Sequence, residues 1–342
     1  MLGGFLSLLA AITFALNNAS ARRGVITGTL EQAMAISVPI GVPMFFLAAW
    51  AAGFLAAVFA FSGEALLALS AAGIVHFVIG RYCNYRANRA IGANLVGPLQ
   101  QTSLMLTLVL AVLILGETLT PLRMLGIALV ALGPMVTMWD DGEKPAPRAI
   151  EPAETADPTA DGGAPARPAP FKMNYPEGVL FALLSAVGYG TSPILVRFGL
   201  TSKDLGASLA GGLISYVAAT LVIAPWLLWP SRIRRVLAVE AEPAKWFTLS
   251  AVTVCISQMF TYMAYAVAPV SVVSPIQRLS IVFRLYFGHW LNPHHEVFGS
   301  KVYLGTAVSL VGALALSVST DVVLAWLPLP DWAVALAHWQ WP

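Results

Sequence analysis

Two arginines lie within a long apolar stretch of the sequence, near residues 270 to 291. A charge in the middle of a membrane span costs at least about 2.5–3.5 kcal/mol, so it needs a partner or a function. A guanidinium group binds a carboxylate or a phosphate through two parallel hydrogen bonds. We therefore expect Arg278 to bind an acidic group of a solute. Arg284, which would lie about 120° from Arg278 around an ideal helix, is expected to bond backbone carbonyls or to extend towards the membrane surface.

Uncharged polar side chains also interrupt the apolar runs in both halves of the chain. Such groups can orient a solute by hydrogen bonds and still release it. Each of them alone could instead bond a neighbouring helix, and Arg278 could likewise bond only nearby carbonyls or polar side chains. Their occurrence at matching places in two halves favours solute binding. Besides Arg278, the expected binding residues are Asn17, Asn18, Gln100, Gln101, Tyr189, Thr191, Gln258, Tyr262 and Gln277.

The sequence has no pattern typical of catalysis inside a membrane. The segment PHHEVF is not an H-E-x-x-H zinc motif, and His76 has no glycine-flanked serine as a partner. Cys83 and Cys255 are far apart in apolar surroundings, which favours structural roles. The basic residues lie in short connecting segments, so no nucleic-acid partner is expected. We expect neither enzyme activity nor a metal or other cofactor.

The composition excludes an ordinary soluble protein. Of the 342 residues, 58% are hydrophobic and 11% are charged, whereas soluble domains carry about 25% charged residues. Crossing the hydrocarbon layer takes about 20 apolar residues in a helix, and ten runs approach that length. The sequence therefore predicts an all-α integral membrane protein with ten transmembrane helices, near residues 2–20, 32–55, 65–86, 93–115, 121–139, 177–197, 207–229, 246–267, 270–291 and 301–319.

A segment rich in proline and charge, residues 140–176, separates two sets of five runs and is expected to be a disordered linker. The two sets resemble each other: at a constant offset of 177, Tyr85 aligns with Tyr262, Pro98 with Pro275 and Gln100 with Gln277. An odd number of spans makes the second copy enter the membrane inverted. We expect a first five-helix repeat at 1–139, a second at 177–320, and a tryptophan-rich interfacial tail at 321–342.

A longer stretch, ANLVGPLQQTSLMLTLVLAVLILGETLTPLRMLGIALVALGP from Ala93, resembles the fourth and fifth helices of the EamA domain in the drug/metabolite transporter superfamily. The second copy keeps Glu296, Gly305 and Gly312 but has Pro293 in place of Gly116. The resemblance implies ten helices as two inverted five-helix repeats and a pathway between the first four spans of each repeat. It also implies transport of small organic solutes, usually export.

Most of the lysines and arginines lie in connections on one side of the predicted membrane. The positive-inside rule therefore puts the linker in the cytoplasm and both termini outside, in a bacterial inner membrane. The expected function is a secondary transporter, an exporter of an anionic or zwitterionic metabolite that works by alternating access as a monomer or homodimer. One alternative is a flippase-like protein that moves a lipid head group within the bilayer. Another is a cation antiporter of the small-multidrug type. Such an antiporter needs a carboxylate in the middle of its first span, whereas the polar residues in the first span of this chain are Ser7, Thr13, Asn17 and Asn18.

Overall fold

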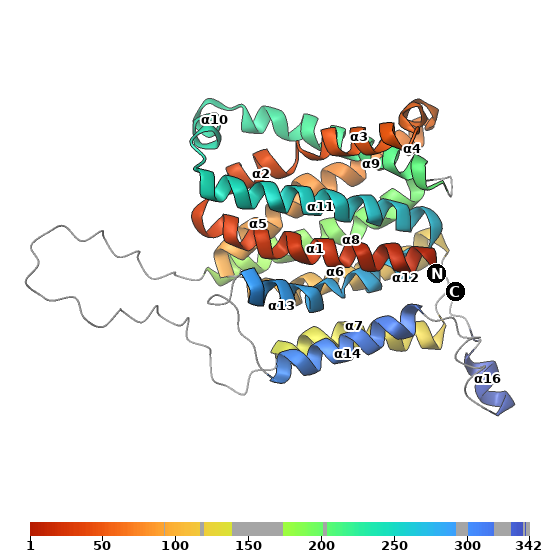
Figure 1. Ribbon diagram of the computed structural model, residues 1–342. Coiled ribbons are helices and arrows are strands. Elements are labelled where there is room, and N and C mark those ends of the chain that lie inside the picture. Colours follow the sequence, from red (N-terminus) through yellow and green to blue (C-terminus); the bar gives the residue numbers. More distant parts are fainter. Residues whose placement is uncertain are drawn as a thin grey trace, which may run out of the picture.

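The fold comes from a computed structural model of the chain. The structure describes residues 1–91, 93–116, 120–138, 174–200, 204–291, 300–317, 330–337 and 339. Within these ranges the regular structure is entirely helical (Figure 1). Helices satisfy their own backbone hydrogen bonds, as the interior of a bilayer requires.

In the first half, two of the expected spans are interrupted helices. The second run bends between α2 and α3, because Pro39 has no N–H to donate to a continuous helix. The third run contains a π-helical segment, η2, between α4 and α5. The helices of this half are α1 (Leu2–Thr27), α2 (Leu30–Ser37), α3 (Gly41–Ala51), η1 (Leu55–Ala60), α4 (Gly63–Gly73), η2 (Ile74–Gly80), α5 (Arg81–Ile91), α6 (Ala93–Leu115) and α7 (Pro121–Met138).

In the second half, the run expected at 270–291 is also two helices, which meet at Arg278 and Leu279. Across the described residues, six segments are long and apolar enough to cross a membrane: Leu2–Val25, Leu30–Ala51, Gly63–Ala87, Tyr175–Gly199, Leu205–Leu227 and Ala241–Val267. The helices of this half are α8 (Tyr175–Gly199), α9 (Leu205–Leu227), α10 (Pro230–Leu237), α11 (Ala241–Val267), α12 (Val270–Gln277), α13 (Ser280–Leu291), α14 (Ser300–Ser317) and α16 (Asp331–Ala337).

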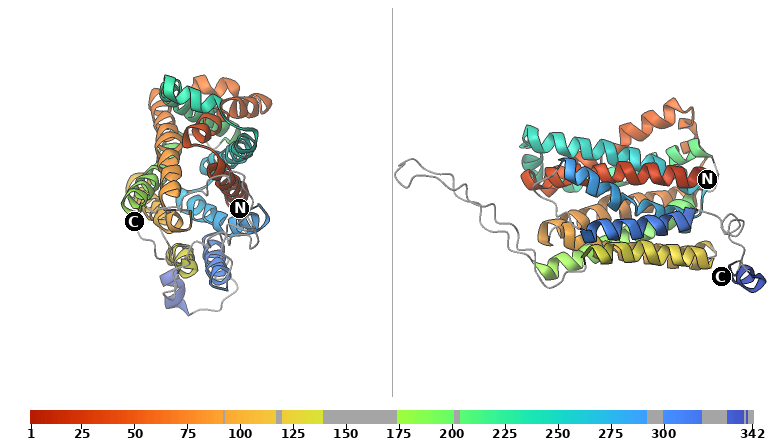
Figure 2. Two further views of the ribbon diagram at one scale, coloured as in Figure 1. Left: turned by 90° about the vertical axis from the view of Figure 1, so that its left-hand side faces the viewer. Right: turned by 60° about the horizontal axis from the view of Figure 1, so that its bottom comes forward.

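Several helices of each half pack against helices of the other half. Helix α1 packs on α11 and α13, and its counterpart α8 packs in the same way on α5 and α6. Helices α3 and α9 pair with each other, as do α7 and α14, which lie together at one side of the bundle (Figures 1 and 2). Each of these contacts joins one half of the chain to the other.

The polarity of the bundle is that of a protein in lipid. Large apolar side chains such as Leu113, Leu221 and Trp290 are exposed on the outside. Serine and threonine side chains are buried, among them Ser103, Thr107 and Ser215. A water-soluble helical bundle shows the opposite arrangement, so the outer surface is suited to hydrocarbon.

Helix α8 includes the last two residues of the segment predicted as linker. Helix α8 begins at Tyr175, inside the segment predicted as linker, because the Asn174 side chain accepts a hydrogen bond from the Glu177 N–H at 3.4 Å and caps the helix. Residues 140–173 lie outside the described part of the structure. In the predicted interfacial tail, the structure describes α16 and a few flanking residues.

Deleting residues 145–170 is expected to leave the protein folded. Each half makes its own backbone hydrogen bonds, and this segment has little apolar surface to contribute to a core. The yield and monodispersity of detergent-extracted protein should match those of the full chain. Loss of folded protein on this deletion would show that the linker has a structural role.

Candidate functional site

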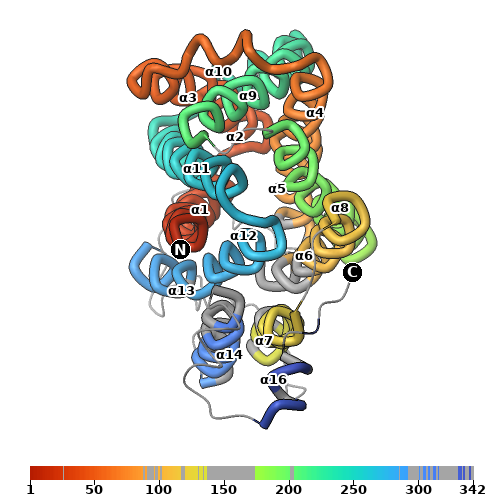
Figure 3. The backbone as a smooth tube through the Cα atoms, turned by 90° about the vertical axis from the view of Figure 1, so that its right-hand side faces the viewer, coloured from red at the N-terminus to blue at the C-terminus, as the bar shows by residue number. Residues whose placement is uncertain are grey.

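A cavity of about 170 Å³ lies at the centre of the bundle. Both repeats contribute to its walls, through α1, η2, α5 and α6 from the first and α8, α11, α12 and α13 from the second. Viewed along the bundle, α1, α5, α6, α8, α11 and α12 surround a common centre, with α13 beside α1 and α12 and with α7 and α14 to one side (Figure 3). A cavity needs only about 10–15 Å³ of such volume to hold one water molecule, so this one has room for several. It is therefore of a size for a small solute.

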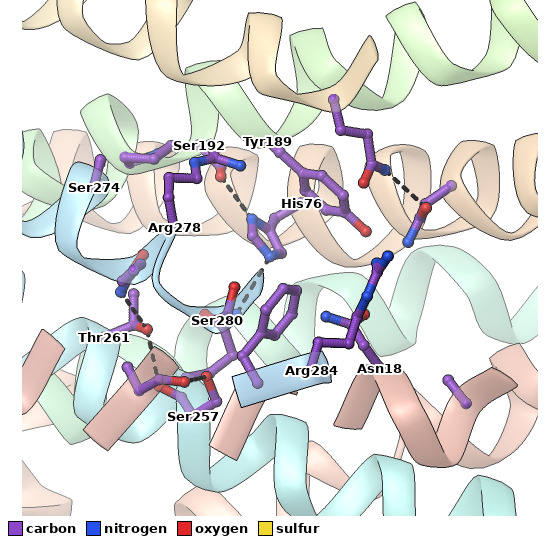
Figure 4. Close-up of a pocket in the computed structure, with 18 of the residues that line it drawn as sticks. Asn18, His76, Tyr189, Ser192, Ser257, Thr261, Ser274, Arg278, Ser280 and Arg284 are labelled. Carbon is purple, nitrogen blue, oxygen red and sulfur yellow. Dashed lines mark hydrogen bonds between the residues drawn. The ribbon is translucent and has the colours of Figure 1, made fainter. Parts of the chain in front are cut away.

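Seven of the ten predicted binding residues line this cavity. They come from α1, α6, α8, α11 and the α12–α13 span, and several are seen in Figure 4. Asn17 lies beside it, at an adjoining void of about 20 Å³, and accepts a hydrogen bond from Ser250 Oγ at 2.6 Å. The side chain of Gln101 is outside the described part of the structure. The seven are Asn18, Gln100, Tyr189, Gln258, Tyr262, Gln277 and Arg278.

Thr191 is not among the residues that line this cavity. Its hydroxyl donates to the carbonyl of Val187, one turn earlier in α8, at 2.9 Å. Two residues along a helix turn the side chain by about 200°. Thr191 therefore faces away from Tyr189, while Ser192, almost a full turn from Tyr189, lines the cavity. The sequence places several polar residues together in α8 but does not show which face they share.

The two glutamines related by the repeat make equivalent hydrogen bonds. Gln100 Nε2 donates to Asn84 Oδ1 at 2.7 Å, and Gln277 Nε2 donates to Thr261 Oγ1 at 2.8 Å. The acceptors are themselves 177 residues apart, like the glutamines. Each bond ties the fourth span of a repeat to its third, so these side chains brace the cavity wall while also lining it.

Arg278 lies at the break between α12 and α13. Pro275 removes one helical hydrogen bond there, and the N–H groups of Arg278 and Leu279 bond three residues back, to Pro275 and Ile276, both at 3.0 Å. The guanidinium Nη2 donates to Ser103 Oγ of α6 at 2.6 Å, across the boundary between the repeats. The acceptor of this bond is a neutral hydroxyl, not a carboxylate.

Arg284 also lines the cavity, contrary to the expectation that the two arginines point to different sides. That expectation assumed one continuous helix. The break after Gln277 changes the direction of the chain, so a rotation of 100° per residue does not hold across it. Figure 4 shows Arg278 near Ser192 and His76, and Arg284 near Asn18. Arg22 lines the same cavity, whose described lining includes no Asp or Glu.

His76 is the functional candidate that the sequence analysis missed, since it was considered there only as a catalytic residue. Its Nδ1 is 2.7 Å from Ser192 Oγ, its Nε2 is 3.4 Å from Gln258 Nε2, and its ring centroid is 4.7 Å from that of Tyr189. It lies in the π-helical segment η2, a distortion that often occurs at functional sites. An ionisable residue within an apolar run was the available signal.

Comparison with known proteins agrees with this architecture. The EamA-like transporter family matches residues 1–139 and 176–318, one match in each half. Among solved structures 26 chains match, and one, described only as "Crystal structure of protein", has a TM-score of 0.59 at 18% sequence identity and covers 92% of this chain and 94% of its own; this likeness concerns the fold alone. No curated protein matches. Because the family matches most of the chain, this protein belongs to the EamA-like transporter family, which consists of membrane transporters of the drug/metabolite type.

Proposed function

We propose that the protein is a secondary transporter that exports a small anionic or zwitterionic metabolite. The observation that carries the proposal is the charge of the central cavity. Arg22, Arg278 and Arg284 line it, and its described lining holds no carboxylate. A solute with a carboxylate or phosphate group supplies the missing negative charge and accepts the paired hydrogen bonds that a guanidinium donates.

Alternating access around this cavity follows from the arrangement of the repeats. The proposed form is ten transmembrane helices as two inverted five-helix repeats. Six are the longer spans given above, and the other four are α6, α7, α12–α13 and α14. Rocking one repeat against the other would open the cavity to each side in turn. Arg278 belongs to one repeat and bonds Ser103 of the other, so this bond is expected to change during the cycle.

The two alternatives predict different walls for the cavity. A cation antiporter of the small-multidrug type needs a buried carboxylate for which the proton and the cation compete, and this cavity is lined by arginines. A flippase-like protein needs a lateral slot through which a lipid head group enters. The central position of the cavity, surrounded by elements of both repeats, favours a solute that enters from water (Figure 3).

An untargeted comparison of the solutes released by cells with and without the protein tests the proposed function. Cells that make the protein should release more of one or a few compounds bearing a carboxylate or phosphate. Cells that make the Arg278→Gln variant, at the same level of folded protein, should resemble cells without it. Release of cationic compounds alone would contradict the proposed substrate class.

We also propose that the linker is cytoplasmic and both termini lie outside, in a bacterial inner membrane, with the bilayer and the solute as partners of a monomer or homodimer. The exposed arginines of α10 and Lys245 at the start of α11 lie at the connection that the positive-inside rule assigns to the cytoplasm. Reporter fusions at Gly162 should be active only with a reporter that works in the cytoplasm. Activity only with a periplasmic reporter would reverse the topology.

A further inference from the structure

We propose that His76 binds a proton when the cavity binds its anionic solute, so that one proton travels with each solute in the same direction. The inference rests on the proposed function and adds the coupling ion to it. Among the residues described as lining the cavity, His76 is the side chain whose ordinary titration lies near physiological pH. The cavity offers no carboxylate in the described lining that could hold a transported proton instead.

The hydrogen bonds of His76 leave one ring nitrogen ready to accept a proton. Nδ1 can donate to Ser192 Oγ, 2.7 Å away, while Nε2 faces the amide nitrogen of Gln258, which is a donor. In this arrangement Nε2 is an acceptor and the ring is neutral. Once Nε2 is protonated it needs an acceptor of its own. Either an acidic group of the solute or the Gln258 oxygen, after a rotation of the amide, can provide one.

The surrounding charges make this protonation depend on the solute. The positive groups that line a void together with the ring are Arg81, in the smaller void, and the cavity arginines Arg22, Arg278 and Arg284. These arginines disfavour a positive charge on the imidazole, and an anion bound among them offsets this repulsion. The other titratable side chains in the described lining of the two voids are phenols: Tyr189 from α8, Tyr85 from α5, and Tyr262 and Tyr265 from α11. Tyr216 of α9 stacks on the neighbouring Phe77, and α4 carries Glu64 only in its first turn.

Binding of the two ions is therefore reciprocal. If an anion in the cavity stabilises the imidazolium form, a proton on His76 must strengthen anion binding by the same factor. The proton comes from water on the side to which the cavity is open, occupies Nε2, and leaves to water on the other side with the solute. His76 of the first repeat also contacts α8 and α11 of the second, so its charge acts where the repeats meet.

Calorimetry on the purified full chain tests the inference. Benzoate, L-glutamate and sulfate serve as probes, because none of them changes its own charge between about pH 6 and about pH 8. Binding is measured in two buffers that differ in ionisation enthalpy, and the difference in heat gives the protons taken up per anion. The wild-type protein should take up a fraction of a proton that rises towards about one as the pH falls.

Two variants and a second measurement make the result decisive. His76→Gln should bind the same anion with no proton uptake, while His289→Gln, at an exposed site late in α13, should behave like the wild type. If His76→Gln does not fold, imidazole NMR on a chain with His289, His294, His295 and His338 replaced by glutamine should show His76 gaining a proton on anion binding. Anion binding without proton uptake, or equal uptake by His76→Gln, would overturn the coupling. Failure of all three probes to bind would instead contradict the anion-binding cavity of the proposed function.

Discussion

Replacing Arg278 with glutamine is expected to abolish export of the acidic solute and leave the protein folded. Glutamine is the residue that the first repeat carries at the equivalent position, Gln101, so the amide is compatible with this span. Losing one partner of a buried, charge-assisted pair costs about 2–5 kcal/mol. This corresponds to a loss of about 30-fold to several thousand-fold in affinity. The measurement is the rate of solute release at matched levels of folded protein.

Two further variants separate charge from geometry. Arg278→Lys keeps the positive charge but loses the planar pair of donors, so it should retain partial transport. Arg235→Gln removes an arginine from α10, where the side chain pairs with Glu31 at 3.1 Å and is 54% exposed, and should transport normally. Normal transport by a folded Arg278→Gln protein would contradict both the role of Arg278 and the anionic substrate.

The helical repeat architecture could be predicted because hydrophobicity acts over whole segments. Runs of about 20 apolar residues must cross the bilayer as helices, and the matches from Tyr85 to Tyr262 and from Gln100 to Gln277 revealed the repeat. The hydrogen bonds of Gln100 and Gln277 to partners that are also 177 residues apart show that the alignment reflects structure. The break at Arg278 was not predicted, because a proline disrupts some helices and only kinks others.

The types of residue that line the cavity could be predicted, but the directions of their side chains less well. Polar residues inside apolar runs were recognisable, and Asn18, Tyr189 and Gln258 do line the cavity. The direction of each side chain depends on the rotation of its helix about the helix axis. Thr191, one of several polar residues in α8, was therefore expected in the cavity but points elsewhere. The rotation is also altered locally by the π-helix at η2 and by the break before α13. For this reason Arg284 was not expected in the cavity, whereas His76 was considered only as a catalytic residue.

Gly73, the last residue of α4, lies directly against the backbone of α9, a helix of the other repeat. A Cβ atom added there would overlap the backbone carbonyl of Ser215 in α9. The two helices are also tied by the Ser215 hydroxyl, which donates to the Leu69 carbonyl of α4 at 2.7 Å and is fully buried. A backbone atom held in this way cannot move aside as a flexible side chain can. The contact between α4 and α9 therefore requires glycine at position 73.

Gly73→Ala is expected to destabilise the protein by about 1–3 kcal/mol through overpacking, and Gly73→Leu to prevent recovery of folded protein. Alanine in a helix is favoured over glycine by roughly 0.5–1 kcal/mol, so a net loss of stability means that the overlap outweighs this gain. The matched control is Gly63→Ala at the first residue of the same helix, where an added Cβ meets no atom within 4 Å. That variant should be as stable as the wild type or slightly more stable. The stability of both variants is measured by thermal unfolding in detergent and by the yield of monodisperse protein. If Gly73→Ala were as stable as the wild type, α4 and α9 would not be held together at this distance.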